Sequence, residues 1–532
     1  MTALKSRLPF ETSLAKSRGC TSAPITLRSV MSGGLAQRRR SEGSKRRRSM
    51  ASLHGLLLLG PAVTVSAETP APEGEPGPAV VESREETRLN TWVSFTLQLN
   101  LEPPDSATGI DRGHPDEPAR RAKPAPLSSP PFPSSEWIGP TIGVPVPSPA
   151  YLLMDALDET RVGRSLSDRR IDTYGWINTS WNWSTSKNSN LPNVYDLVPN
   201  RVELNQLVLR VERNPDTVQK TRTDWGFRVS ALYGTDYRFT VAKGWFDRQL
   251  LKRNELYGFD MPELYALCYV PDVADGMLIK FGRFISPPDI EAQLAPDNYL
   301  FTHSTMFSID PYTFTGVLAS VKLDDQWTVQ GGVHGGSDMA PWSDSSSLNA
   351  HFMVRWVSED NNDSIYAGIN SIGDGTYRNG HDNLQHIVGT WSHRFSARVH
   401  TATELYYMWQ FDALKGGSVN NGPVRSFGGG GGPGPLIPGL SDSIGAVNYF
   451  QVQLSDRDYV SFRNDFLADF QGQRTGYENY YSSHTVGWSR NLTPWSTIRP
   501  EIKYEHAYNT PAYDNGTKRD QLKFAVDLIV RF

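Results

Sequence analysis

DQLKFAVDLIVRF, residues 520–532, alternates apolar and polar side chains up to a final aromatic residue. One face of this stretch is apolar at every second position, and the other carries Lys523, Asp527 and Arg531. A period of two over this length predicts a β-strand with one apolar and one charged face. In a water-soluble sandwich the charged face would meet solvent. In a transmembrane barrel the apolar face meets lipid and the charged face meets a wet interior.

The sequence upstream repeats this pattern in segments of about ten residues, a length that suits a tilted strand crossing a bilayer. The clearest of them, 496–507, places Arg499, Glu501, Lys503 and Glu505 on one face, which is too much charge for a dry core. The predicted strands are 171–183, 202–213, 224–235, 262–271, 276–285, 312–323, 326–335, 348–358, 364–373, 384–394, 398–410, 444–454, 459–470, 480–490, 496–507 and 520–532.

The connections between these segments alternate between long and short. Long ones such as 184–201, 236–261 and 411–443 are followed by short ones such as 324–325 and 455–458. Outer-membrane barrels have long outer loops, short periplasmic turns and an even number of strands. We therefore predict an all-β fold: a transmembrane antiparallel β-barrel of about 16 strands over residues 171–532, embedded in outer-membrane lipid.

Bulk composition leaves both this barrel and a β-rich secreted domain open. The chain has 532 residues, a formal net charge of −4 and 14 Trp, 22 Tyr and 22 Phe, enough aromatic residues for two interfacial girdles. It has no run of about 18 uninterrupted apolar residues, so no helical span is predicted. Cys268 is the single cysteine beyond the expected leader, which excludes an intrachain disulfide there.

The N-terminal part is predicted to be a targeting segment followed by a spacer. Residues 1–67 comprise a basic leader, an apolar run at 53–65 and a small-x-small site that predicts cleavage after Ala67. Residues 68–149 are rich in Pro, Ala, Glu and Ser and are predicted to form a disordered periplasmic spacer. Residues 150–170 are expected to hold a short helix, over 151–166, and a linker. The Arg clusters directly precede the apolar run, so we predict no nucleic-acid partner.

The third long connection, 286–311, carries four acidic residues and no Lys or Arg. We expect it to fold into the barrel and to form an acidic pore constriction with Asp289, Glu291 and Asp297, which would repel anions. The alternative is an ordinary outer loop held by its own prolines.

The charged residues on inward positions are the predicted pore lining. Both signs occur in near balance, so any selectivity, a weak cation preference, is expected to come from the third connection. The predicted lining residues are Arg210, Glu212, Arg228, Arg499, Glu501, Lys503, Glu505, Lys523, Asp527 and Arg531. Apolar residues occupy both faces of the fourth, fifth and eighth segments, which is expected at a subunit interface, as in a homotrimer, or where a loop packs inside.

Several short patches resemble the OmpL-like beta-barrel porin family of double-membraned bacteria. They are Met154–Leu157, Tyr174–Asn178, Asn200–Gln206, Gly282–Ile285, Pro288–Ala292, Pro296–Tyr299 and Thr315–Val317. The resemblance covers residues 151 to 532. It implies passive diffusion of small hydrophilic solutes and supplies no catalytic residues and no cofactor. The terminal Phe532 also resembles the signal by which the barrel-assembly machinery selects its substrates.

Two other functions stay open at this stage. A barrel hydrolase needs a Ser–His pair, and the candidates are His386, His393 and His400 with Ser392. A structural or receptor barrel without an open pore would use the spacer and the outer loops. The oxygen-rich loop 373–383 lacks the spacing and the closing Glu of an EF-hand, so no metal site is predicted.

Overall fold

The computed structural model describes residues 110–111, 120–121, 142–144 and 151–532, except 194, 254, 361, 379–382, 397 and 417–433. The expected leader and most of the expected spacer lie outside the described residues. Within the spacer, β1 (Ile110–Asp111) and β2 (Arg120–Arg121) form an antiparallel pair. No helix in the described part of the chain is long and apolar enough to cross a membrane.

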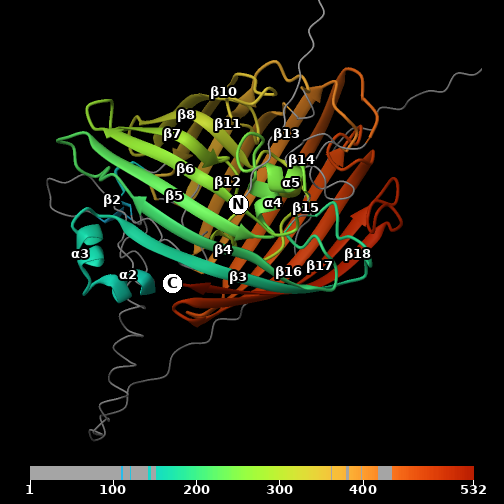
Figure 1. The fold of residues 1–532 in the computed structure, drawn as a ribbon, viewed down its shortest axis with the longest axis horizontal. Helices are drawn as coiled ribbons and strands as arrows, with labels where there is room; N and C mark the ends of the chain where they lie inside the picture. The colour runs from blue at the N-terminus through green and yellow to red at the C-terminus, as the bar shows by residue number, and fades with distance from the viewer. Residues whose placement is uncertain are drawn as a thin grey trace, which may run out of the picture. The chain divides into compact units, whose positions relative to one another are not determined.

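Sixteen strands, β3 to β18, form a closed barrel in which β18 pairs with β3 (Figure 1). Every neighbouring pair is antiparallel, so the predicted fold class is confirmed. The strands are β3 (Asp172–Ser184), β4 (Val202–Arg213), β5 (Asp224–Gly234), β6 (Gly258–Val270), β7 (Met277–Ile285), β8 (Thr313–Lys322), β9 (Trp327–His334), β10 (Asn349–Val357), β11 (Asp363–Ile372), β12 (Gln385–Ser396), β13 (Val399–Phe411), β14 (Leu440–Gln453), β15 (Asp458–Asp469), β16 (Asn479–Thr493), β17 (Ser496–Ala507) and β18 (Asp520–Arg531).

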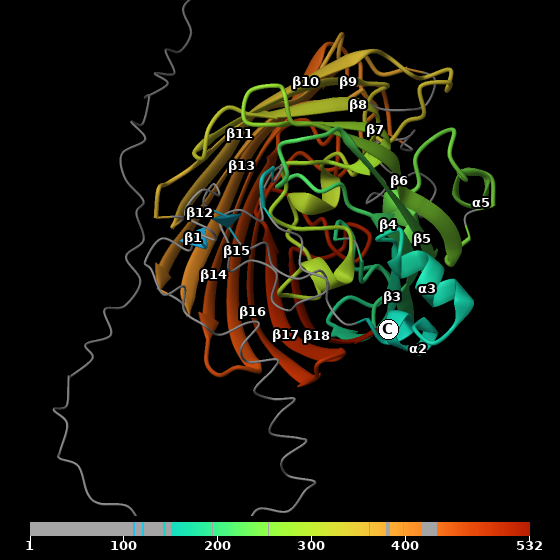
Figure 2. The same ribbon diagram turned by 90° about the vertical axis from the view of Figure 1, so that its left-hand side faces the viewer.

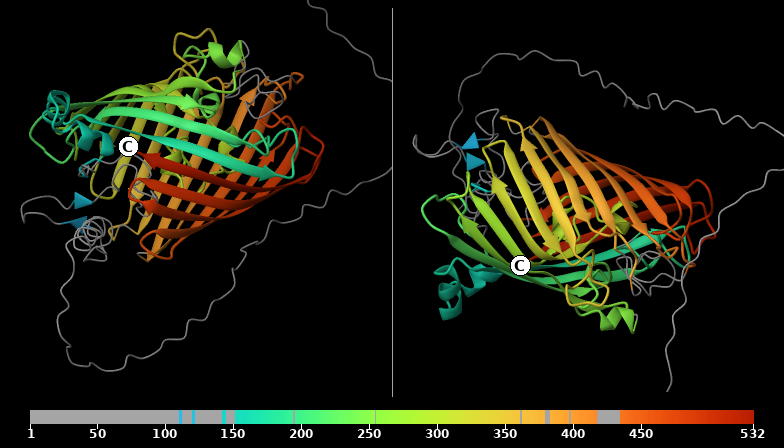
Figure 3. Two further views of the ribbon diagram at one scale, coloured as in Figure 1. Left: turned by 60° about the horizontal axis from the view of Figure 1, so that its bottom comes forward. Right: turned by 90° about the horizontal axis from the view of Figure 1, so that it is seen from above.

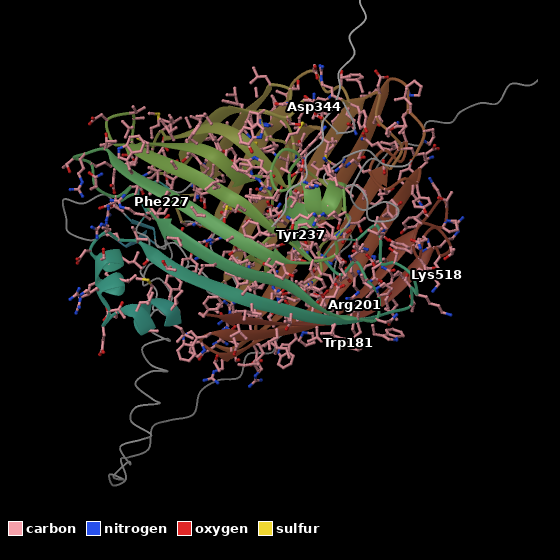
Figure 4. All side chains as sticks on the ribbon, viewed as in Figure 1. Trp181, Arg201, Phe227, Tyr237, Asp344 and Lys518 are labelled. Carbon is pink, nitrogen blue, oxygen red and sulfur yellow. The ribbon has the colours of Figure 1, made fainter. Side chains whose placement is uncertain are left out.

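The alternation of side chains decides which face of each strand points inward. In β18, Lys523, Asp527 and Arg531 are buried inside the barrel, while Leu522 and Phe524 are exposed on the outside. The outer surface is apolar on the other strands too, and Figure 4 shows Trp181 projecting outward from β3. An apolar outer face and a charged inner face are the arrangement expected for a barrel surrounded by lipid.

The predicted alternation of connection lengths is also present. Long connections include 185–201, 235–257 and 412–439, and short ones include 323–326 and 494–495. The strands slant across the barrel, and the chain ends at the rim that carries the short turns (Figure 3).

Two helices, α2 (Leu152–Leu157) and α3 (Arg161–Ser167), lie where the sequence predicted one. Thr160 begins α3, because its side chain accepts a hydrogen bond from the Gly163 amide.

Short helices occur in the long connections. The second connection holds α4 (Tyr237–Thr240) and α5 (Arg248–Leu251), and the third, residues 286–312, holds the 3₁₀ turns η1 (Ala295–Asp297) and η2 (Phe307–Ile309). The two turns of the third connection lie within the ring of strands (Figure 2, yellow-green). We call residues 286–312 the third loop.

Candidate functional site inside the barrel

A ladder of alternating charges crosses the inner faces of β4, β5 and β6. Arg210 donates to Glu263 over 2.6 Å, and its guanidinium lies over the rings of Tyr174 and Trp176. Arg228 bridges two carboxylates, donating to Glu212 over 2.7 Å and to Glu263 over 3.0 Å. Three of these four residues were predicted to face inward. Glu263 was missed, although its position in β6 has the same parity as the buried Tyr265 and Leu267.

A second charge network covers the inner faces of β17 and β18. Arg499 and Asp527 form a bidentate pair, with one contact of 2.9 Å. Lys503 lies 2.8 Å from Glu505 on the same strand. Lys523 lies 2.7 Å from Asp196, which belongs to the first long connection. All of these predicted lining residues are buried, because loops inside the barrel cover them.

The third loop is fixed to the inner wall by strand side chains that bind its backbone. Glu501 accepts hydrogen bonds from the amides of Phe301 and Thr302 over 2.9 Å and 3.1 Å. Arg499 donates to the Ala295 carbonyl over 3.0 Å, and Lys503 donates to the His303 carbonyl over 2.8 Å. Charged hydrogen bonds of this kind are about twice as strong as neutral ones, so the loop is held at several points.

Two inward-facing glycines make room for apolar side chains of this loop. A Cβ on Gly487 of β16 would lie 2.2 Å from Leu300, and one on Gly445 of β14 would lie 2.6 Å from the Tyr406 ring and 2.9 Å from Met306. Leu300 and Met306 are 1% exposed. The loop therefore packs against the wall by shape as well as by hydrogen bonds.

The three acidic residues predicted for the constriction have different surroundings. Glu291 is turned into the wall, where it accepts a hydrogen bond from Tyr449 over 2.6 Å and lies 3.4 Å from Arg463. Asp297 is half-buried in η1. Burial raises the pKa of Asp297, and the nearby Arg210 opposes that shift.

Asp289, the third of these residues, is partly exposed as a whole, but both of its carboxylate oxygens are buried among other carboxyls. Oxygen atoms of Asp289, Asp310 and Glu404 all lie within 4.8 Å of one another. Burial raises the pKa of Asp289 well above its usual range, and the Glu404 carboxyl adds to the rise. The prediction grouped Asp289 with Glu291 and Asp297 but did not foresee its contact with β13.

The remaining predicted residues are Arg531 and Phe532. Arg531 is buried and donates to Thr497 over 2.8 Å. Phe532 exchanges two backbone hydrogen bonds of 2.9 Å with Gly175 across the junction of β18 and β3.

The histidines considered for a hydrolase are bound to other residues. His386 contacts the Asn370 amide over 3.0 Å, and His400 contacts the Tyr299 hydroxyl over 2.9 Å. His393 faces outward and lies 2.7 Å from Asp363. None of these partners is a serine, so this geometry lends no support to a Ser–His pair.

Comparison with known proteins gives one family and a set of solved structures. Residues 170–532 match the model of the family described as "Putative beta-barrel porin-2, OmpL-like". No curated protein matches the sequence.

Three of the similar solved structures have low sequence identity to this chain. A loop-deletion mutant of OmpT from Vibrio cholerae is 10% identical, with 68% of this chain and 99% of that chain covered and a TM-score of 0.42. An anion-selective porin from Comamonas acidovorans is 10% identical over the same shares, with a TM-score of 0.41. The outer membrane channel DcaP of Acinetobacter baumannii is 8% identical, covers 68% and 97%, and has a TM-score of 0.43.

Proposed function

The chain belongs to the OmpL-like family of beta-barrel porins, and from this we propose a porin that lets small hydrophilic solutes diffuse passively, with a weak preference for cations. The observation that carries the proposal is the third loop, which lies along the inner wall and binds β17 through Glu501, Arg499 and Lys503. A loop held inside a barrel narrows the passage, and the charges at a narrow point act strongly on passing ions.

The weak cation preference rests on Asp297, the acidic residue of the loop that keeps some exposure. Glu291 is 3% exposed and lies beside Arg463, and both carboxylate oxygens of Asp289 are buried. Arg228, whose side chain is 22% exposed, contributes positive charge on β5. Because charges of both signs face the lumen, we expect a modest selectivity in place of full exclusion of anions.

The test is single-channel conductance of the refolded barrel in a planar bilayer, with reversal potential measured under a salt gradient. We expect stable ohmic steps and a cation-selective potential. Asp297→Asn should move the potential away from cation selectivity. Asp344→Asn is the matched control, because Asp344 lies in another long connection at the barrel rim (Figure 4).

Other outcomes would change the proposal. A barrel that inserts but passes no current would favour the structural or receptor role. Currents with no effect of Asp297→Asn would keep the pore but remove the loop as the source of selectivity.

We also propose that the protein forms a homotrimer. The apolar residues on both faces of β7 support this proposal, and crosslinking in the membrane tests it.

A further inference from the structure

Three carboxylates from distant parts of the sequence converge where the third loop meets β13. Asp289 follows the end of β7, Asp310 precedes the start of β8, and Glu404 points inward from β13. One oxygen atom from each lies within 4.8 Å of the other two. The two ends of the loop and a strand from another part of the barrel therefore meet at one point.

The Asp310 carboxylate is buried, with an exposed fraction of 0%. Among the described residues, neither of its oxygen atoms has a hydrogen-bond partner. Its strongest electrostatic neighbours are carboxyls, first Asp289 and Glu404, then Glu291 and Asp338. Burying an ionised carboxylate is unfavourable unless a cation or hydrogen-bond donors compensate it. An unpaired carboxylate aimed at two others is therefore a reason to look for a bound cation.

Two hydrogen bonds connect this region to the rest of the barrel. Arg474 donates to the carbonyl of Ile309, the residue before Asp310, over 2.8 Å. Glu404 accepts one hydrogen bond from the Ile290 amide over 2.8 Å, through a single oxygen. The other Glu404 oxygen is therefore available for a ligand bond.

The spacing suits a hard divalent cation. Calcium binds oxygen ligands at about 2.3–2.6 Å, so two ligand atoms on opposite sides of the ion are about 4.6–5.2 Å apart. Carboxylate oxygens that all lie within 4.8 Å of one another can thus surround one calcium ion. Magnesium prefers about 2.0–2.1 Å and a strict octahedron, which would require the three groups to draw closer together.

We propose that Asp289, Asp310 and Glu404 form a binding site for a divalent cation, best matched by calcium, that fastens both ends of the third loop to β13. Both carboxylate oxygens of Asp289 are buried, as are the Asp310 and Glu404 side chains. The inference concerns binding and loop anchoring, so it stands whether or not the barrel conducts.

The experiment uses the refolded protein in detergent after treatment with EDTA and removal of the chelator. Calcium chloride is titrated while thermal unfolding is followed, and Tb³⁺ luminescence excited through tyrosine gives a direct readout of binding. Tyr312 and Tyr406 are electrostatic neighbours of Asp310 and can sensitise the lanthanide. We expect saturable Tb³⁺ binding that calcium reverses, and a rise in unfolding temperature with calcium.

Asp310→Asn and Glu404→Gln should weaken the binding of either ion at least tenfold. Removing one of three mutually repelling carboxylates should leave the calcium-free protein at least as stable as the wild type, while its response to calcium is lost. This combination separates a cation site from a merely structural contact. Asp289→Asn is the second variant if Asp310→Asn does not refold.

Glu359→Gln, in a short turn at the barrel rim, is the matched control and should behave as the wild type. The proposal is overturned if the wild type shows neither Tb³⁺ luminescence nor a calcium-dependent shift. It is also overturned if Asp310→Asn and Glu404→Gln respond to calcium as the wild type does.

Discussion

Gly175 and Phe532 meet where the barrel closes: they exchange two backbone hydrogen bonds of 2.9 Å, and the Phe532 ring fills the space that a side chain at position 175 would need. A Cβ at this position would lie 2.7 Å from the Phe532 ring and 2.1 Å from the Val208 carbonyl oxygen. A ring packed over a strand glycine is a known way to stabilise a sheet at a position without a side chain.

Gly175→Ala is therefore expected to destabilise the closed barrel by about 1–3 kcal/mol, the usual range for overpacking. Urea unfolding of the refolded protein in detergent measures this. Gly389→Ala is the control, because its added Cβ would come no closer than 3.4 Å to Ala367. Equal stability of the two variants would show that the contact with Phe532 does not constrain closure.

Phe532→Ala separates barrel closure from the predicted recognition by the assembly machinery. Refolding in detergent takes place without that machinery, so the refolding yield of Phe532→Ala should fall no further than the refolding yield of Gly175→Ala. In cells, the amount of assembled barrel should fall much further for Phe532→Ala. Similar losses in cells for both variants would argue against a recognition signal at Phe532.

The buried pair Arg499–Asp527 is expected to matter far more than an exposed one. Arg499→Ala leaves the Asp527 carboxylate buried with less compensation and frees the Ala295 carbonyl, so we expect a loss of about 3–5 kcal/mol in the free energy of unfolding. Arg490→Ala, in a pair whose arginine is 44% exposed, should cost at most about 1 kcal/mol. Urea unfolding compares the two, and equal losses would contradict the prediction.

Lipid contact on the outer face can be tested at Ile502, which is 55% exposed in the middle of β17. Ile502→Lys should cost about 2–4 kcal/mol in lipid if this position lies near the centre of the bilayer, and less near an interface. Val202→Lys, at the first residue of β4, is the control and should cost about 0–1 kcal/mol. Folding into liposomes measures the free energy of folding of both variants. If Ile502→Lys leaves this free energy unchanged, residue 502 lies away from the hydrocarbon.

Arg228→Gln should increase the preference for cations. The substitution removes the bridge between Glu212 and Glu263 and leaves two carboxylates with less compensating charge on the inner wall. The reversal potential under a salt gradient should move toward the cation value, opposite to the effect of Asp297→Asn. A shift of the same sign in both variants would contradict the proposal that charges on the third loop and on β5 act on the passing ions.

The period-two pattern predicted the strands closely because each residue in a barrel strand faces either lipid or the interior. The largest errors are at β6, which begins at Gly258 and was predicted from 262, and at β14, which begins at Leu440 and was predicted from 444. Both extensions break the alternation, with Asp-Met-Pro at 260–262 and Ser-Asp-Ser at 441–443.

The contacts inside the barrel could be predicted only in part. Inward parity follows from position in a strand, and it identified the charges of β4, β17 and β18. Which carboxylate meets which partner depends on how the loop crosses the interior. Glu291 and Arg463 are 172 positions apart, and nothing local in either segment indicates that they meet. The same holds for Asp310 and Glu404, so the sequence predicted no cation site.

The anchoring of the third loop also bears on the order of assembly. The loop lies between β7 and β8, yet the amide of Phe301 binds a side chain 200 positions further along the chain. Contacts between such distant positions form late, because the intervening chain must be ordered first. The loop can reach its final position only after β17 is in place, so an incompletely closed barrel would have an unobstructed interior and would leave Leu300 and Met306 in water.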